Sequence, residues 1–176
     1  MQMRWRTKKL VLSSILIALG IGLQIAESMF PIPVNIPGGK LGLANIVTVV
    51  ILYAFDAKTA LLCAILRSFL GSILYGGVTS AIYSVSGAVF AWVMMILAKR
   101  VSNGKLTQIG VSVIGAVSHN MAQVFVASLV LSNVWIFTYL PILGVASCIT
   151  GVFTGYSARY AVMYLMKTGV GTKKDK

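Results

Sequence analysis

Six apolar stretches follow one another along the chain, separated by short polar, charged or glycine-rich breaks. The stretches cover residues 10–29, 41–55, 59–76, 79–98, 109–132 and 138–166. A helix needs roughly 20 apolar residues to cross the hydrocarbon core of a bilayer. Five stretches are long enough to do so, whereas the second, with 15 residues, would by itself suit a buried helix. The pattern therefore predicts membrane-spanning helices and leaves the second stretch to be decided by charge.

The distribution of positive charge favours counting the second stretch as a span. With the N-terminus inside, the inner segments carry twelve cations: Arg4, Arg6, Lys8, Lys9, Lys58, Lys99, Arg100, Lys105, Lys167, Lys173, Lys174 and Lys176. The outer segments carry only Lys40, which fits the excess of cations on the cytoplasmic side of membrane proteins. We therefore predict an all-α protein with six transmembrane helices and both termini cytoplasmic. Residues 1–166 form one domain of the plasma membrane, and 167–176 form a basic cytoplasmic tail.

The amino-acid composition argues against a soluble domain and against several classes of function. Hydrophobic residues make up 58% of the 176 residues and charged ones 10%, whereas soluble domains carry about 45–50% and 25%. The net charge of +12 lies at the ends of apolar stretches, with no interleaved aromatic patch, which argues against nucleic-acid binding. Cys63 and Cys148 show no metal-ligand spacing, so we expect neither a metal nor a cofactor.

Arg67 is the most informative single residue. It lies eight residues after Thr59, about 12 Å into the third stretch, and arginine at such depth costs about 2.5–3.5 kcal/mol on insertion scales. We expect its side chain to face the interior of the bundle. It then meets either a structural partner in the chain or an anionic or carbonyl-rich ligand.

Further polar residues fall at similar depth or near the outer ends of the helices. His119, Asn120 and Gln123 lie together in the fifth stretch and indicate either a polar cavity or satisfied core residues. The other candidate ligand-binding residues are Glu27, Lys40, Asn45, Tyr75, Tyr83 and Ser84. Alternatively, Glu27 does not bind a ligand and forms an ion pair with Lys40 or Arg67. The proline-rich loop 30–40 is either a lid over the site or a plain connector.

Small residues recur at every fourth position of the first stretch: Ser14, Ala18, Gly22 and Ala26. This spacing places them on one face of a helix, where another helix can approach closely. That helix belongs either to the same chain or to a separate membrane protein that docks there.

The acids and loops of the chain argue against enzymatic chemistry. There is no glycine-rich loop with the Lys-Ser/Thr pair that binds ATP. Apart from Asp175 in the tail, the acids are Glu27 and Asp56, which we place on opposite sides of the membrane. Magnesium-dependent diphosphate chemistry needs clustered carboxylates. We therefore expect a protein that is not an enzyme.

Five blocks of sequence resemble a known family. They are FPIP at 30–33 with GKLGLANIVT at 39–48, RSFLGS at 67–72 with YGG at 75–77, YSVSG at 83–87, GVSVIGAVSHNMAQ at 110–123, and YLP at 139–141. Together they resemble the Gx transporter family, often labelled "heptaprenyl diphosphate synthase component I". That family is similar to the substrate-binding S components of energy-coupling factor (ECF) transporters.

The resemblance implies a six-helix bundle with a pocket near the outer face beneath the first loop. It also implies that the small-residue face docks onto a transmembrane coupling subunit driven by two ATPase subunits, although Gly22 replaces an alanine of the strict motif. The expected function is uptake of a small vitamin-like or anionic metabolite, with an isoprenoid or quinone precursor as one candidate. The alternative is a membrane accessory subunit of isoprenoid, quinone or flavin-linked electron-transfer metabolism. A free-standing carrier is less favoured, because the chain has no clustered acids for ion coupling.

Overall fold

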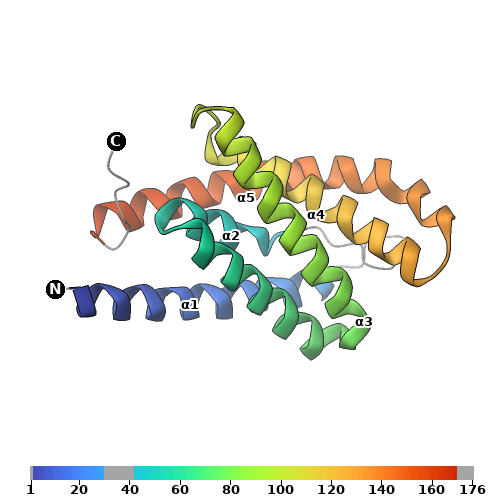
Figure 1. Ribbon diagram of the computed structural model, residues 1–176, viewed down its shortest axis with the longest axis horizontal. Helices are drawn as coiled ribbons and strands as arrows, with labels where there is room; N and C mark the ends of the chain where they lie inside the picture. Colours follow the sequence, from blue (N-terminus) through green and yellow to red (C-terminus); the bar gives the residue numbers. More distant parts are fainter. Residues whose placement is uncertain (1, 30–41, 170–176) are drawn as a thin grey trace.

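The computed structural model describes residues 2–29 and 42–169, and the regular structure in these segments is helical. Its elements are α1 (Gln2–Met29), α2 (Asn45–Ala54), α3 (Ala57–Val101), α4 (Gln108–Val130), the 3₁₀ helix η1 (Val134–Tyr139) and α5 (Leu140–Lys167) (Figure 1). Five segments are long and apolar enough to cross a membrane: Trp5–Glu27, Ala57–Leu74, Gly76–Val101, Gln108–Val130 and Val134–Lys167. The predicted all-α membrane bundle is confirmed.

Two polar links show how the first part of the chain runs through the bundle. The Lys9 ammonium pairs with the Asp56 carboxylate, which ties the beginning of α1 to the junction of α2 and α3. At the other end of α1, Glu27 accepts hydrogen bonds from the backbone just before α2. The chain therefore ascends in α1 and returns through α2. Figure 1 shows the beginning of α1 and the end of α5 at the same end of the bundle, as the six-pass prediction requires.

The second pass differs from the expected span over 41–55. Helix α2 has 10 residues, about 15 Å of helix, or half of a hydrocarbon core of about 30 Å. It is the central helix, in contact with α1, α3, α4 and α5, and eight of its residues are buried. The remainder of the described crossing, Gly42 to Ala44, is not helical. Such backbone is tolerated at membrane depth only where protein surrounds it and satisfies its polar groups.

The stretches expected as separate spans over 59–76 and 79–98 form one helical run with a kink at Gly77. The φ and ψ angles of Gly77 are 74° and −172°, a region that essentially only glycine occupies. The kink turns α3 back on itself, so that its two arms form a V (Figure 1). The Asp56 carboxylate caps the first arm by accepting a hydrogen bond from the Thr59 amide, at 2.8 Å.

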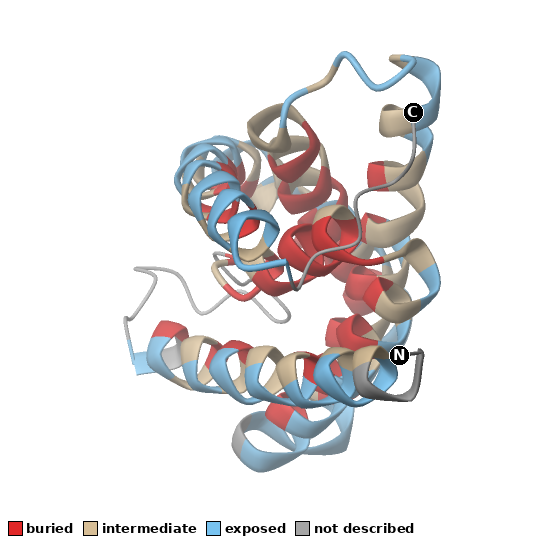
Figure 2. Ribbon diagram, turned by 90° about the vertical axis from the view of Figure 1, so that its left-hand side faces the viewer, coloured by how far each residue is buried: buried red, intermediate tan, exposed pale blue. Residues whose placement is uncertain are grey.

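Packing leaves α1 at the edge of the bundle. Among the described elements it contacts α2 and α3. Figure 2 shows buried residues gathered where helices face one another and exposed ones along the outer faces. Those outer faces carry large apolar side chains such as Leu74, Phe125 and Phe153, as expected for helices that meet lipid.

Candidate functional site

A small polar cavity lies at the centre of the bundle. It is lined by residues from α1, the segment before α2, α2, both arms of α3, and α4: Gln24, Glu27, Gly42, Ala44, Asn45, Arg67, Ser84 and His119. Five of these were singled out from the sequence: Glu27, Asn45, Arg67, Ser84 and His119. The cavity has a volume of about 10 Å³, which is room for about one water molecule.

Arg67 is the charged centre of this site, and the expectation that it faces the interior is confirmed. Its side chain is 3% exposed, and it lies ten residues after Ala57, about 15 Å along α3. Its Nη1 donates a hydrogen bond to Gln24 Oε1 at 3.3 Å, and Gln24 Nε2 donates to Ser72 Oγ at 3.0 Å. Gly20 makes room for it, because a Cβ there would lie 2.4 Å from Arg67 Cδ.

The guanidinium of Arg67 is only partly hydrogen-bonded. Its Nε and Nη2 atoms are buried and have no hydrogen-bond partner among the described residues. Asn45 Nδ2, on the wall of the same cavity, also lacks one. Buried polar groups in proteins are almost always paired, and each exception calls for a reason. Among the described residues no side chain fills this role, and a bound ligand is the kind of group that would fit a cavity at this place.

Glu27 has a structural task as well as a place on the cavity wall. Its Oε1 accepts from the Gly42 amide at 2.7 Å and its Oε2 from the Leu43 amide at 3.1 Å. These bonds satisfy the non-helical backbone that leads into α2. The Glu27 carboxylate also lies on the wall of the same cavity as the Arg67 guanidinium. Lys40, the other partner considered from the sequence, lies outside the described residues.

The three polar residues of α4 do not all meet at the cavity. His119 lines it, whereas Asn120 turns to α5, where its Nδ2 donates to Ser147 Oγ at 2.6 Å. Neighbouring residues of a helix point about 100° apart, which separates these two. Gln123 is fully buried beside Gly87, whose added Cβ would lie 2.8 Å from Gln123 Cγ. Neither polar atom of the Gln123 amide has a hydrogen-bond partner.

The aromatic candidates do not form part of the described cavity wall. Tyr83 is 5% exposed and packs in an apolar cluster with Val124, Ala127, Ile136 and Leu143. Tyr75 lies in α3, but its side chain is outside the description. The lid expected over 30–40 also lies outside the described residues.

Sequence reasoning missed two polar residues that are linked to Arg67. Gln24 accepts a hydrogen bond from the guanidinium, and Ser72 in turn accepts one from Gln24. A signal for Gln24 was available. It is an amide within an apolar stretch, four residues after Gly20 and three before Glu27, so all three share a helix face.

The small-residue face of α1 points away from the bundle. Ser14, Ala18, Gly22 and Ala26 are all exposed, whereas Gly20, Gln24 and Glu27 on the opposite side are buried. A Cβ at Gly22 would meet no atom within 4 Å. The described part of this chain therefore leaves the small-residue face uncovered.

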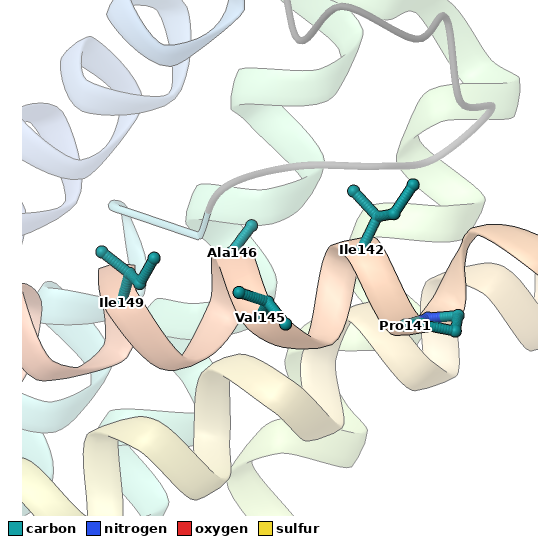
Figure 3. Close-up of a pocket in the computed structure, with 5 residues that line it drawn as sticks. All are labelled: Pro141, Ile142, Val145, Ala146 and Ile149. Carbon is teal, nitrogen blue, oxygen red and sulfur yellow. The ribbon is translucent and has the colours of Figure 1, made fainter.

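Two larger hollows have a different character. One, of about 530 Å³, lies along α5 and is lined by Pro141, Ile142, Val145, Ala146 and Ile149. Ile142, Ala146 and Ile149 point to one side of the helix (Figure 3), and this apolar lining suits lipid chains. The other, of about 300 Å³, lies at the end of the bundle where Asp56, Lys99 and Arg100 gather.

Residues 16–161 match the family described as Heptaprenyl diphosphate synthase component I. The match spans most of the 176 residues, including every residue that lines the central cavity, so the chain belongs to this family. No curated protein and no solved structure matched the chain.

Proposed function

We propose that this member of the heptaprenyl diphosphate synthase component I family is a substrate-binding membrane subunit. It would act as the S component of an ECF-type transporter in the plasma membrane, for uptake of a small vitamin-like or anionic metabolite. An isoprenoid or quinone precursor remains a candidate. The observation that carries the proposal is the central cavity, where buried atoms of Arg67 and Asn45 have no hydrogen-bond partner.

The energetics of burial support a ligand at this place. A buried polar atom without a partner costs about 1–3 kcal/mol, and more when the group is charged. A chain that only had to fold could replace such groups by apolar ones at little loss. A ligand that supplies the missing acceptors repays this cost when it binds. Because the cavity holds about 10 Å³, roughly the room for one water, its walls must separate to admit a metabolite.

The outward face of α1 supports docking of a partner subunit. Close approach of two helices in a membrane needs small side chains at the contact, and Ser14, Ala18, Gly22 and Ala26 present them away from the bundle. The proposed partners are a transmembrane coupling subunit and two ATPase subunits. They would supply the ATP hydrolysis for which this chain has no P-loop sequence.

The family description favours a second candidate, an accessory subunit of isoprenoid, quinone or flavin-linked electron-transfer metabolism. A synthase that binds magnesium and diphosphate needs grouped acids. This chain has three in all, of which Asp56 is paired with Lys9 at the far end of α1 from Glu27. We therefore propose a binding subunit and not an enzyme in both cases.

Affinity purification of the tagged protein from its own membranes tests the proposal. We expect one membrane subunit and two ATPase subunits to co-purify. Gly22→Leu should remove them, because the leucine side chain fills the docking face. Gly144→Leu is the matched control, because a Cβ at Gly144 also meets no atom within 4 Å but lies on α5. Recovery of a prenyl or redox enzyme without ATPases would instead support the accessory role.

A further inference from the structure

One edge of the Arg67 guanidinium has no hydrogen-bond partner in the part of the chain that the structure describes. Nη1 is used by Gln24, whereas Nε and Nη2 are buried and without a hydrogen-bond partner. The N–H bond of Nε and one N–H bond of Nη2 run parallel along the same edge of the planar group. Their spacing matches two oxygens of one carboxylate or phosphate, the pairing for which arginine is favoured over lysine.

The two acidic residues among the described residues, Glu27 and Asp56, already have other partners. Glu27 lines the same cavity, but its two oxygens accept from the amides of Gly42 and Leu43. Asp56 pairs with Lys9, near the opposite end of α1. The Nε–Nη2 edge therefore has no bidentate acceptor within the described residues, while Asn45 Nδ2 adds a third donor on the cavity wall.

Charge and size distinguish between the two kinds of anion. Among the described residues of the cavity wall, the positive charge of Arg67 is matched by the negative charge of Glu27. A carboxylate would bring the buried site to −1 and a phosphate dianion to −2, and an uncompensated buried charge is strongly unfavourable. A flat, three-atom carboxylate would also require less separation of the walls of the closed cavity, about 10 Å³ in volume, than a tetrahedral phosphate would.

We propose that the ligand of this site carries a carboxylate, whose two oxygens accept hydrogen bonds from Nε and Nη2 of Arg67 while Asn45 donates a further bond. This inference rests on the proposed function and specifies the chemical class of the substrate. In this proposal Arg67 recognises the ligand through hydrogen bonds to two coplanar oxygens, and not through its positive charge alone. Lysine, which offers a point charge, cannot reproduce that contact.

The test uses small probes on the full chain in lipid nanodiscs, after extended washing to remove bound metabolites. Sodium acetate supplies the carboxylate, acetamide is the neutral isostere, and inorganic phosphate at matched ionic strength supplies the tetrahedral anion. The readouts are the thermal unfolding midpoint, which a ligand of the folded state raises, and the Nε–H resonances of the five arginines in ¹⁵N-arginine-labelled protein.

We expect acetate to raise the midpoint in a saturable manner and to shift one arginine resonance, the one missing from Arg67→Lys. Acetamide and phosphate should bind at least tenfold more weakly than acetate. Arg67→Lys should weaken acetate binding about tenfold or more, as expected for loss of one charge-assisted bond. Asn45→Ala, which leaves Arg67 in place, should weaken it less. Equal effects of acetate and acetamide, or tighter binding of phosphate, would overturn the proposal without recourse to any variant.

Mass spectrometry of metabolites that co-purify with the unwashed protein separates this inference from the proposed function. A bound metabolite with a carboxylate supports both. A bound metabolite without one overturns the carboxylate assignment and leaves the transport subunit standing. If the protein recruits no ATPase subunits and yet binds acetate at Arg67, the proposed function fails while the chemistry of the site holds.

Discussion

Replacement of Gly20 by alanine tests whether close packing of α1 positions Arg67. A Cβ at Gly20 would lie 2.4 Å from Arg67 Cδ, 3.0 Å from Val47 Cγ2 and 3.2 Å from Arg67 Cγ. Ordinary contact requires about 3.4–4 Å, so the middle of the arginine side chain must move by about 1 Å, the difference between 3.4 and 2.4 Å. The guanidinium cannot follow freely, because Nη1 is bonded to Gln24.

The expected loss of stability follows from this crowding. Overpacking of a buried site costs about 1–3 kcal/mol of stability. For a chain of this size, each kcal/mol lost lowers the unfolding temperature by about 2–4 °C. Gly22→Ala is the matched control. It makes the same substitution half a helical turn away, where a Cβ meets no atom within 4 Å, so the gain in helix propensity is common to both variants.

The assay compares thermal unfolding of the two variants in nanodiscs, together with acetate binding. We expect Gly20→Ala to unfold at lower temperature than Gly22→Ala and to bind acetate more weakly. If the two variants unfold at the same temperature and bind acetate equally, α1 does not position Arg67 and the reasoning is refuted.

Three further predictions concern the fold. Gly77→Ala should lower the unfolding temperature in circular dichroism melts, because alanine at φ 74° and ψ −172° costs about 1–3 kcal/mol; an unchanged melt would contradict the kink. Gly151→Ala should destabilise the protein to denaturant by about 1–3 kcal/mol, because its Cβ would lie 2.7 Å from the Val113 Cα, a backbone atom; equal stability would show that α4 and α5 are less closely packed. Burial alone would raise the pKa of Asp56, but the hydrogen bonds from Lys9 and Thr59 and the charge of Lys9 together outweigh burial, so the pKa is lowered. The stabilisation is therefore complete above about pH 4 and is lost as the pH falls through the lower folded-state pKa, so Asp56→Asn should show a smaller drop in unfolding temperature between neutral and acidic pH than the unmodified protein.

Hydropathy was sufficient to predict an all-α membrane bundle, since five described segments are long and apolar enough to cross a membrane. The ion pair between Asp56 and Lys9 brings the segment around Lys58 to the same end of the bundle as the beginning of α1, as the charge pattern predicted. The length of α2 was harder to predict, because apolar residues continue through 41–44 while Glu27 holds the backbone of Gly42 and Leu43 outside the helix. That effect depends on hydrogen bonds between Glu27 and backbone groups that lie 15 and 16 positions later in the chain. A local hydropathy pattern does not contain this information.

The candidate site shows the same division between local and long-range information. The isolated charge of Arg67 in an apolar stretch indicated its burial. Its contact with Gln24 joins residues 43 positions apart and could not be read from spacing. His119 and Asn120 looked equivalent in the sequence, and only the packing of α4 against α5 assigns Asn120 to Ser147.

Native mass spectrometry of the protein extracted gently from its own membranes tests the central claim most directly. The unmodified protein should carry a small molecule in addition to its chain mass. Arg67→Gln, checked for folding by its thermal melt, should lose that molecule, whereas Gly22→Leu should retain it. A bare chain mass for the unmodified protein, or the same small molecule on folded Arg67→Gln, would contradict a ligand site built around Arg67.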